Sequence, residues 1–185
     1  MTGSLVRAAL VAVFCLAIPG CAGVATDRDG SFDFAAVRNY AWKEPPQFAG
    51  DAGDDDAEQL LTQVQRRIDR ALTRRGIGLV DKPEADVVLN ATLRIETRVQ
   101  DNDPQFAVFV AEEFEIATLE IEIFERVLRR SVWSGSSHDR LRYLSRATSG
   151  VEVRFVPTDE PRSWHLDDMV DRITAKLPGS LGKPR

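Results

Sequence analysis

The sequence predicts an α+β domain, with a mainly antiparallel sheet of about four strands and two helices packed on one face. Residues 85–99 and 115–126 have an apolar side chain at every second position, which predicts two strands with one buried face. Residues 60–72 and 166–177 have apolar side chains at helical spacing, which predicts two amphipathic helices. The predicted order along the chain is strand, helix, strand, strand, strand, helix (β-α-β-β-β-α).

The first strand and the first helix follow from local patterns. Residues 31–34 and 40–42 alternate aromatic and other side chains, as expected of a half-buried strand. The apolar stripe of the helix consists of Leu60, Leu61, Val64, Ile68 and Leu72. Acidic residues 54–56 suit the positive end of the helix dipole, and Gly76 provides a C-terminal stop. If the strands on either side of this helix pair, they make one parallel, right-handed connection.

The two central strands are expected to bring opposite charges together on their solvated face. Arg94 and Arg98 lie on the solvated face of one strand, and Glu120 and Glu122 lie on that of the other. Pairs of this kind stabilise a sheet by a few tenths of a kcal/mol each, on the order of 0.2 to 1.

The C-terminal part of the domain begins with a tight reversal near residues 127–130, which leads into a strand through residues 132–133. The stretch 136–162 is polar, although alternation within residues 151–155 predicts an additional edge strand. The last helix ends at residues 178–179, a Pro-Gly pair.

The N-terminal residues have the features of a secretory signal. Arg7 precedes an apolar run over residues 8–18, within the roughly 7 to 15 residues typical of a signal peptide. A membrane-spanning helix needs about 20 apolar residues, so this run is too short to span. Pro19 and Gly20 then break any helix just before Cys21.

Residues 18–21, Ile-Pro-Gly-Cys, resemble the lipobox of bacterial lipoproteins. The resemblance implies that Cys21 receives a diacylglycerol, that the chain is cut just before it, and that acyl chains such as palmitate attach the protein to a membrane. Ala22 after the cysteine implies delivery to the outer membrane, on its periplasmic face. The alternative is an ordinary secretory signal cut after Ala25, which would leave a soluble periplasmic protein.

This interpretation divides the chain into four parts: a lipoprotein signal peptide (1–20), a lipidated tether (21–30), a single α+β domain (31–178) and a flexible tail (179–185). The net charge of −5 makes a nucleic-acid partner unexpected. The chain has two cysteines, and Cys15 leaves with the signal peptide, so no disulfide is expected.

Several short segments resemble a family of bacterial lipoproteins known as domain of unknown function 4136. They are Tyr40-Ala41-Trp42, Leu72-Thr73-Arg74-Arg75-Gly76-Ile77, Ala85-Asp86-Val87-Val88-Leu89, Val132-Trp133-Ser134-Gly135, and a closing helix that runs into Leu177-Pro178. The chain departs from the family at residues 126–130, where members often have Asp or Gly, and at 138–161, which has the features of an insertion. The family has no assigned activity, so the resemblance implies a fold and a location.

No segment predicts a catalytic residue, a metal ligand set or a cofactor site. Residues 136–139, Ser-Ser-His-Asp, contain the residue types of a hydrolase triad, but triad members are seldom adjacent in sequence, and a polar loop explains them better. His165 with Asp167 and Asp168 would make only half a metal site. Acidic residues 51–58 lack the spacing of a calcium loop. The remaining cluster is a set of helical arginines, expected to be solvated or, alternatively, to contact anionic lipids: Arg66, Arg67, Arg70, Arg74 and Arg75.

One apolar stretch lies in the connection between the two central strands: Phe106, Val108, Phe109 and Val110. We expect an extension of the hairpin to bury some of these side chains. Otherwise they would form an exposed apolar tip, which suits contact with a partner or a membrane.

Taken together, these patterns favour a non-enzymatic envelope lipoprotein whose domain binds an envelope protein or supports an assembly. The alternative is a carrier that holds a lipid or another amphiphile between sheet and helices. A hydrolase that uses His138 or His165 is the remaining rival.

Overall fold

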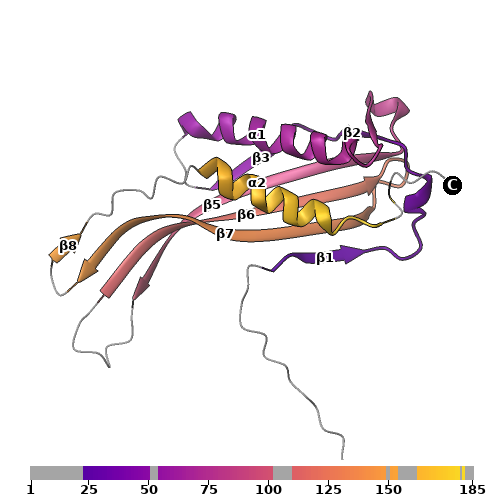
Figure 1. Ribbon diagram of the computed structural model, residues 1–185. Coiled ribbons are helices and arrows are strands. Elements are labelled where there is room, and N and C mark those ends of the chain that lie inside the picture. Colours follow the sequence, from indigo (N-terminus) through magenta and orange to yellow (C-terminus); the bar gives the residue numbers. More distant parts are fainter. Residues whose placement is uncertain are drawn as a thin grey trace, which may run out of the picture.

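Three long strands form the antiparallel centre of the protein: β5 (Val87–Asp101), β6 (Val110–Glu125) and β7 (Ser131–Thr148). The computed structural model describes residues 23–50, 54–101, 110–148, 151–153, 162–179 and 181. Two helices, α1 (Asp54–Thr73) and α2 (Arg162–Ala175), lie together on one face of the sheet (Figure 1). The prediction of two helices on one face is confirmed.

Five short strands extend this centre to an eight-stranded mixed sheet. They are β1 (Ala25–Arg28), β2 (Asn39–Trp42), β3 (Gln47–Gly50), β4 (Gly78–Leu79) and β8 (Val151–Val153). The sheet order is β1-β7-β6-β5-β2-β4, with β3 also paired to β5 and β8 to β7. Strand β2 runs parallel to both β4 and β5, and β3 runs parallel to β5.

The predicted sheet of about four mainly antiparallel strands is therefore wrong, although the α+β class is correct. The strands that the sequence did not predict, β1, β3 and β4, have only two to four residues, which is too short for a period of two to be recognised. The strands predicted at residues 40–42 and within 151–155 are present as β2 and β8. Strand β1 lies inside the range expected to be a tether, and all four of its residues are exposed. The predicted parallel connection around α1 is present, because β2 and β5 pair with Tyr40 opposite Val87.

Two further predictions, a strand at residues 31–34 and a loop at residues 136–139, are wrong. Residues 31–34 do not form a strand; Phe34–Ala36 form a 3-10 helix, η1, whose preceding Asp33 accepts a hydrogen bond from the Ala35 amide. The stretch from Ser136 to Asp139 is not a loop but the middle of β7. Backbone pairing with β6 holds this stretch extended, whatever the polarity of its side chains.

The charge pairs predicted between β5 and β6 are not seen among these described residues, because neither arginine lies directly opposite a glutamate of that set. Thr92 lies opposite Glu120, and Arg94 lies opposite Thr118. Arg94 and Arg98 instead flank Glu96 on their own strand, each at 3.4 Å.

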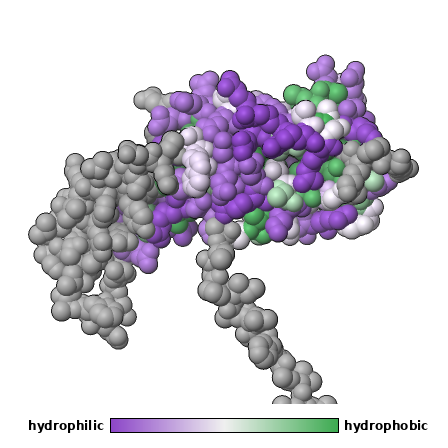
Figure 2. Space-filling view, viewed as in Figure 1, coloured by the Kyte–Doolittle hydropathy of each residue, from purple (hydrophilic) through white to green (hydrophobic). Residues whose placement is uncertain are grey.

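The core fills the space between the helices and the sheet. Both helical stripes are buried, with Val64 and Ile68 of α1 and Met169 and Ile173 of α2 at most 1% exposed. The strand residues beneath them are equally buried: Leu89, Leu93, Leu119 and Ile123. Outside this core, the helix-bearing side is mainly hydrophilic (Figure 2). Among the described helices, neither is long and apolar enough to cross a membrane.

Candidate functional site

The hydrolase candidate in β7 does not assemble in the structure. Successive residues of a strand face opposite sides, so Ser137 is buried beneath the helices while His138 is exposed on the other face. His138 and Asp139 therefore point in opposite directions and cannot act on one reacting atom. The alternation of side chains along β7 therefore keeps the members of this candidate triad apart.

His165 lies in α2 near Asp139, with 3.8 Å between Nδ1 of the imidazole and Oδ2 of the carboxylate. The same Oδ2 accepts a hydrogen bond of 3.0 Å from Arg172. Asp168 pairs with Arg172 at 2.9 Å, and Asp167 accepts a hydrogen bond from Gln63 of α1. Within the described ranges, no three His, Cys, Asp or Glu side chains are grouped to hold a metal ion.

Other predicted site residues lie outside the described part of the chain. Cys21 precedes the first described residue, and Phe106, Val108 and Phe109 fall within the undescribed range 102–109. Val110 is the first residue of β6. The lipidation site and the apolar tip therefore stay predictions.

The segment Tyr40-Ala41-Trp42, which contributes to the family resemblance, connects β2 to α1 by hydrogen bonds. The Tyr40 hydroxyl donates a 2.6 Å hydrogen bond to Oδ1 of Asp69 in α1, and the Trp42 indole donates one of 2.9 Å to the same oxygen. Burial, together with the Asp69 carboxylate, raises the pKa of Tyr40 well above its usual value. These two aromatic residues position α1 on β2.

Asp86 and Gly135, which lie in two other segments that resemble the family, also have structural roles. Oδ2 of Asp86 accepts hydrogen bonds from the amides of Arg38 and Asn39, at 2.8 and 3.0 Å, and so fixes the start of β2. Gly135 lies under the Trp133 indole, and a Cβ atom at this position would be 2.5 Å from the ring and 2.9 Å from Ile173 of α2. Close packing of α2 on β7 thus requires glycine here.

A buried ion pair joins the N-terminal end of α2 to the sheet. Arg162 donates hydrogen bonds of 2.7 and 3.1 Å to the two carboxylate oxygens of Glu115 in β6. A further bond of 3.2 Å reaches Asp56 near the start of α1. The side chains of Arg162 and Glu115 are only 16% and 8% exposed. We therefore assign the pair a structural role in holding α2 on the sheet.

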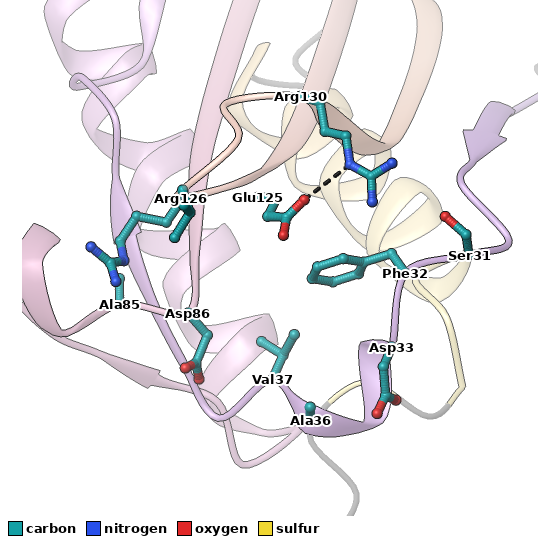
Figure 3. Close-up of a pocket in the computed structure, with 11 residues that line it drawn as sticks. Ser31, Phe32, Asp33, Ala36, Val37, Ala85, Asp86, Glu125, Arg126 and Arg130 are labelled. Atoms are coloured by element: carbon teal, nitrogen blue, oxygen red, sulfur yellow. Dashed lines mark hydrogen bonds and ion pairs between the residues drawn. The ribbon is translucent and has the colours of Figure 1, made fainter.

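The end of the sheet at the β6–β7 turn has two pockets, and Arg126 lines both. The first has a volume of about 490 Å³ and lies between the turn and the segment around η1 (Figure 3). Its Arg130 pairs with Asp29 and Glu125, each at 2.9 Å. The Ser31 hydroxyl and amide hold the pKa of Asp29 below its usual value. The single charge of Arg130 is thus more than compensated by its two carboxylate partners.

The second pocket has a volume of about 680 Å³ and opens on the sheet face that the helices leave uncovered. Its lining combines a half-buried apolar floor with four exposed cationic side chains: Val88, Phe124, Lys43, Lys82, Arg126 and Arg129. Glu44 and Pro83 complete it. We name this site the basic pocket.

The basic pocket is a feature that the sequence did not predict. Its residues come from the end of β2, from η2 (Lys82–Glu84) and from the β6–β7 turn, which are far apart in sequence. One sequence feature pointed to this region. The turn over residues 126–130 has arginines where family members often have Asp or Gly.

Comparison with protein families gives one match across most of the chain. The model of a family described as a domain of unknown function (DUF4136) matches residues 24–178. The resemblance predicted from short sequence segments is therefore confirmed. A search of curated proteins gave no match.

Solved structures support the same fold. A DUF4136 family protein from Bacteroides thetaiotaomicron is similar at 12% identity and a TM-score of 0.50, covering 86% of this chain and 97% of that one. PelC from Paraburkholderia phytofirmans, solved as a dodecamer, is similar at 12% identity and a TM-score of 0.50. That match covers 85% of this chain and 99% of PelC. At these identities the similarity concerns the fold alone.

Proposed function

This chain belongs to the DUF4136 family, and on that premise we propose that it is an envelope lipoprotein, anchored through acyl chains on Cys21, whose domain binds a protein partner without catalysis. The observation that carries the proposal is the position of β1. This strand begins at Ala25, four residues after Cys21, and pairs with β7 from Ala25–Ser136 to Arg28–Trp133. Four extended residues reach at most about 14 Å, so an anchor on Cys21 would hold the domain close to the membrane surface.

A binding role is supported by the uncovered face of the sheet. In the described part of the chain, both helices lie on the opposite face of the sheet (Figure 1), so they leave this face uncovered. Thr92, Glu122 and Ser134 are only partly buried on this face, and Glu120 is exposed. A broad polar surface on rigid strands suits recognition of another protein.

Two observations favour this role over the rivals. The space between helices and sheet is filled by side chains such as Leu119 and Met169, both fully buried, which argues against a carrier that holds a ligand there. The separation of His138 and Asp139 on opposite faces of β7 argues against a hydrolase built on residues 136–139.

Site-specific photocrosslinking in intact cells tests the proposal. A crosslinking residue replaces Glu120 on the uncovered face, and the matched control replaces the exposed Thr62 on the outer side of α1. We expect one discrete crosslinked species from position 120 and none from position 62, with the protein in the outer-membrane fraction. Equal crosslinking from both positions, or none from either, would contradict the binding role.

A further inference from the structure

The basic pocket lies at one end of the uncovered sheet face, where three separate segments meet. Lys43 follows β2, Lys82 lies in η2, and Arg126 and Arg129 lie in the β6–β7 turn. Its volume of about 680 Å³ falls within the roughly 300 to 1,000 Å³ usual for small-molecule sites. Segments distant in sequence thus place four cationic side chains around one opening.

The protein offsets the charge of these cations only in part. Within the ranges that the structure describes, no ion pair is seen for Lys43, Lys82, Arg126 or Arg129. The one carboxylate of the lining, on Glu44, accepts a hydrogen bond of 2.5 Å from Gln47. The neighbouring pocket differs, because its Arg130 has two carboxylate partners. In a chain of net charge −5, a lining with four cations and one carboxylate is positive overall and favours an anionic ligand.

The backbone at Arg129 supports a role for its side chain. Its φ of 54° is the one positive value of a non-glycine residue among the described residues. Glycine would relax this position, because a Cβ atom is disfavoured in the left-handed region. The turn therefore keeps a guanidinium at the rim of the pocket despite the conformational cost, a situation that is common at functional sites.

The floor of the basic pocket is apolar. Val88 and Phe124 are neighbours on the uncovered face, since β5 and β6 pair them directly. The Lys43 ammonium lies 4.8 Å from the centroid of the Phe124 ring, within cation–π distance. A ligand here would meet an apolar surface below and positive charge at the rim.

We propose that the basic pocket binds a phosphate group carried on an apolar body. A phosphate monoester has up to two negative charges and several acceptor oxygens, which suit several cations at once better than a single carboxylate does. Arginine adds donors whose planar arrangement matches phosphate oxygens. Two sources share this chemistry, a free amphiphilic phosphate and a phospholipid headgroup. The inference does not depend on acylation of Cys21.

Nuclear magnetic resonance titration of the full chain in non-ionic micelles tests the ligand chemistry. The probes are hexyl phosphate, inorganic phosphate and hexanol. We expect amide shifts around Lys43, Lys82 and Arg129, with hexyl phosphate binding at least tenfold more tightly than hexanol and several-fold more tightly than inorganic phosphate. Equal affinity for hexanol would overturn the anionic part of the proposal, and equal affinity for inorganic phosphate would overturn the apolar part.

The two sources are separated by vesicles of phosphatidylcholine with or without phosphatidic acid. If the ligand is a lipid headgroup, the full chain with Cys21→Ala binds the vesicles that contain phosphatidic acid and shows the same amide shifts. If the ligand is a free amphiphile, hexyl phosphate binds and the two kinds of vesicle do not differ. Absence of binding to hexyl phosphate and to both vesicles overturns the proposal.

A pair of matched charge reversals locates the site. Lys43→Glu with Arg129→Glu alters the basic pocket, and Arg66→Glu with Arg70→Glu makes the same change of net charge on the exposed side of α1. We expect the first variant to lose at least tenfold in affinity for hexyl phosphate and the second to change by less than twofold. Equal losses would contradict a local site. Arg129→Gly keeps a relaxed turn, so weaker binding by this folded variant supports a direct role of the guanidinium.

Discussion

The hydroxyl of Tyr40 in β2 donates a 2.6 Å hydrogen bond to the carboxylate of Asp69 in α1, across 29 positions of sequence. The Trp42 indole donates to the same oxygen, so one acceptor serves two aromatic side chains. In this chain, both aromatic side chains therefore hold the first helix on the sheet.

Replacement of Asp69 tests that arrangement. Asp69→Ala leaves two donors without a partner, and we expect a loss of about 2 to 4 kcal/mol in the free energy of unfolding. Asp69→Asn keeps an oxygen that can accept both bonds, so its loss should be less than half as large. Chemical denaturation measures both, and equal losses would show that the shared acceptor is not the stabilising feature.

The raised pKa of Tyr40 predicts a dependence of stability on alkaline pH. The folded protein keeps this phenol protonated, so its contribution is complete below the unfolded phenol pKa of about 10 and is lost as pH rises above it. Between pH 10 and 11.5, the stability advantage of the wild type over Tyr40→Phe should shrink by up to about 1.4 kcal/mol per pH unit. Parallel stability curves for the two proteins would contradict this.

Gly135 provides a test of the packing between β7 and α2. Gly135→Ala introduces a Cβ atom 2.5 Å from the Trp133 ring, so the indole or the helix must move. We expect a loss of about 1 to 3 kcal/mol and a change in near-ultraviolet circular dichroism. Gly179→Ala is the control, because its Cβ meets nothing within 4 Å and should leave both measurements unchanged.

Much of the fold was predictable because long segments have clear periodicity. The burial pattern of β5, with Leu89, Leu93 and Ile95 inward, follows from alternation along the strand, and both helices follow from their apolar stripes. The acidic start of α1 and the stop at Gly76, whose φ is 78°, were also apparent from sequence. These features depend on residues close together in the chain.

The features that could not be predicted depend on pairing between distant segments. A two-residue strand such as Gly78–Leu79 exists because β2 supplies its partners. The register of β5 on β6 places Arg94 opposite Thr118 because pairing of the whole hairpin, rather than local charge attraction, determines it. The basic pocket also depends on pairing between distant segments, since Lys43 and Arg129 line one pocket only in the folded chain.

The proposed anchor consists of acyl chains on Cys21, four residues before the first strand begins at Ala25. Metabolic labelling of cells with a radioactive or clickable palmitate, followed by isolation of the wild type and of Cys21→Ala, tests it most directly. We expect label in the wild type and none in the variant, with the variant lost from the membrane fraction. Equal labelling of the two proteins, or label in neither, would contradict it.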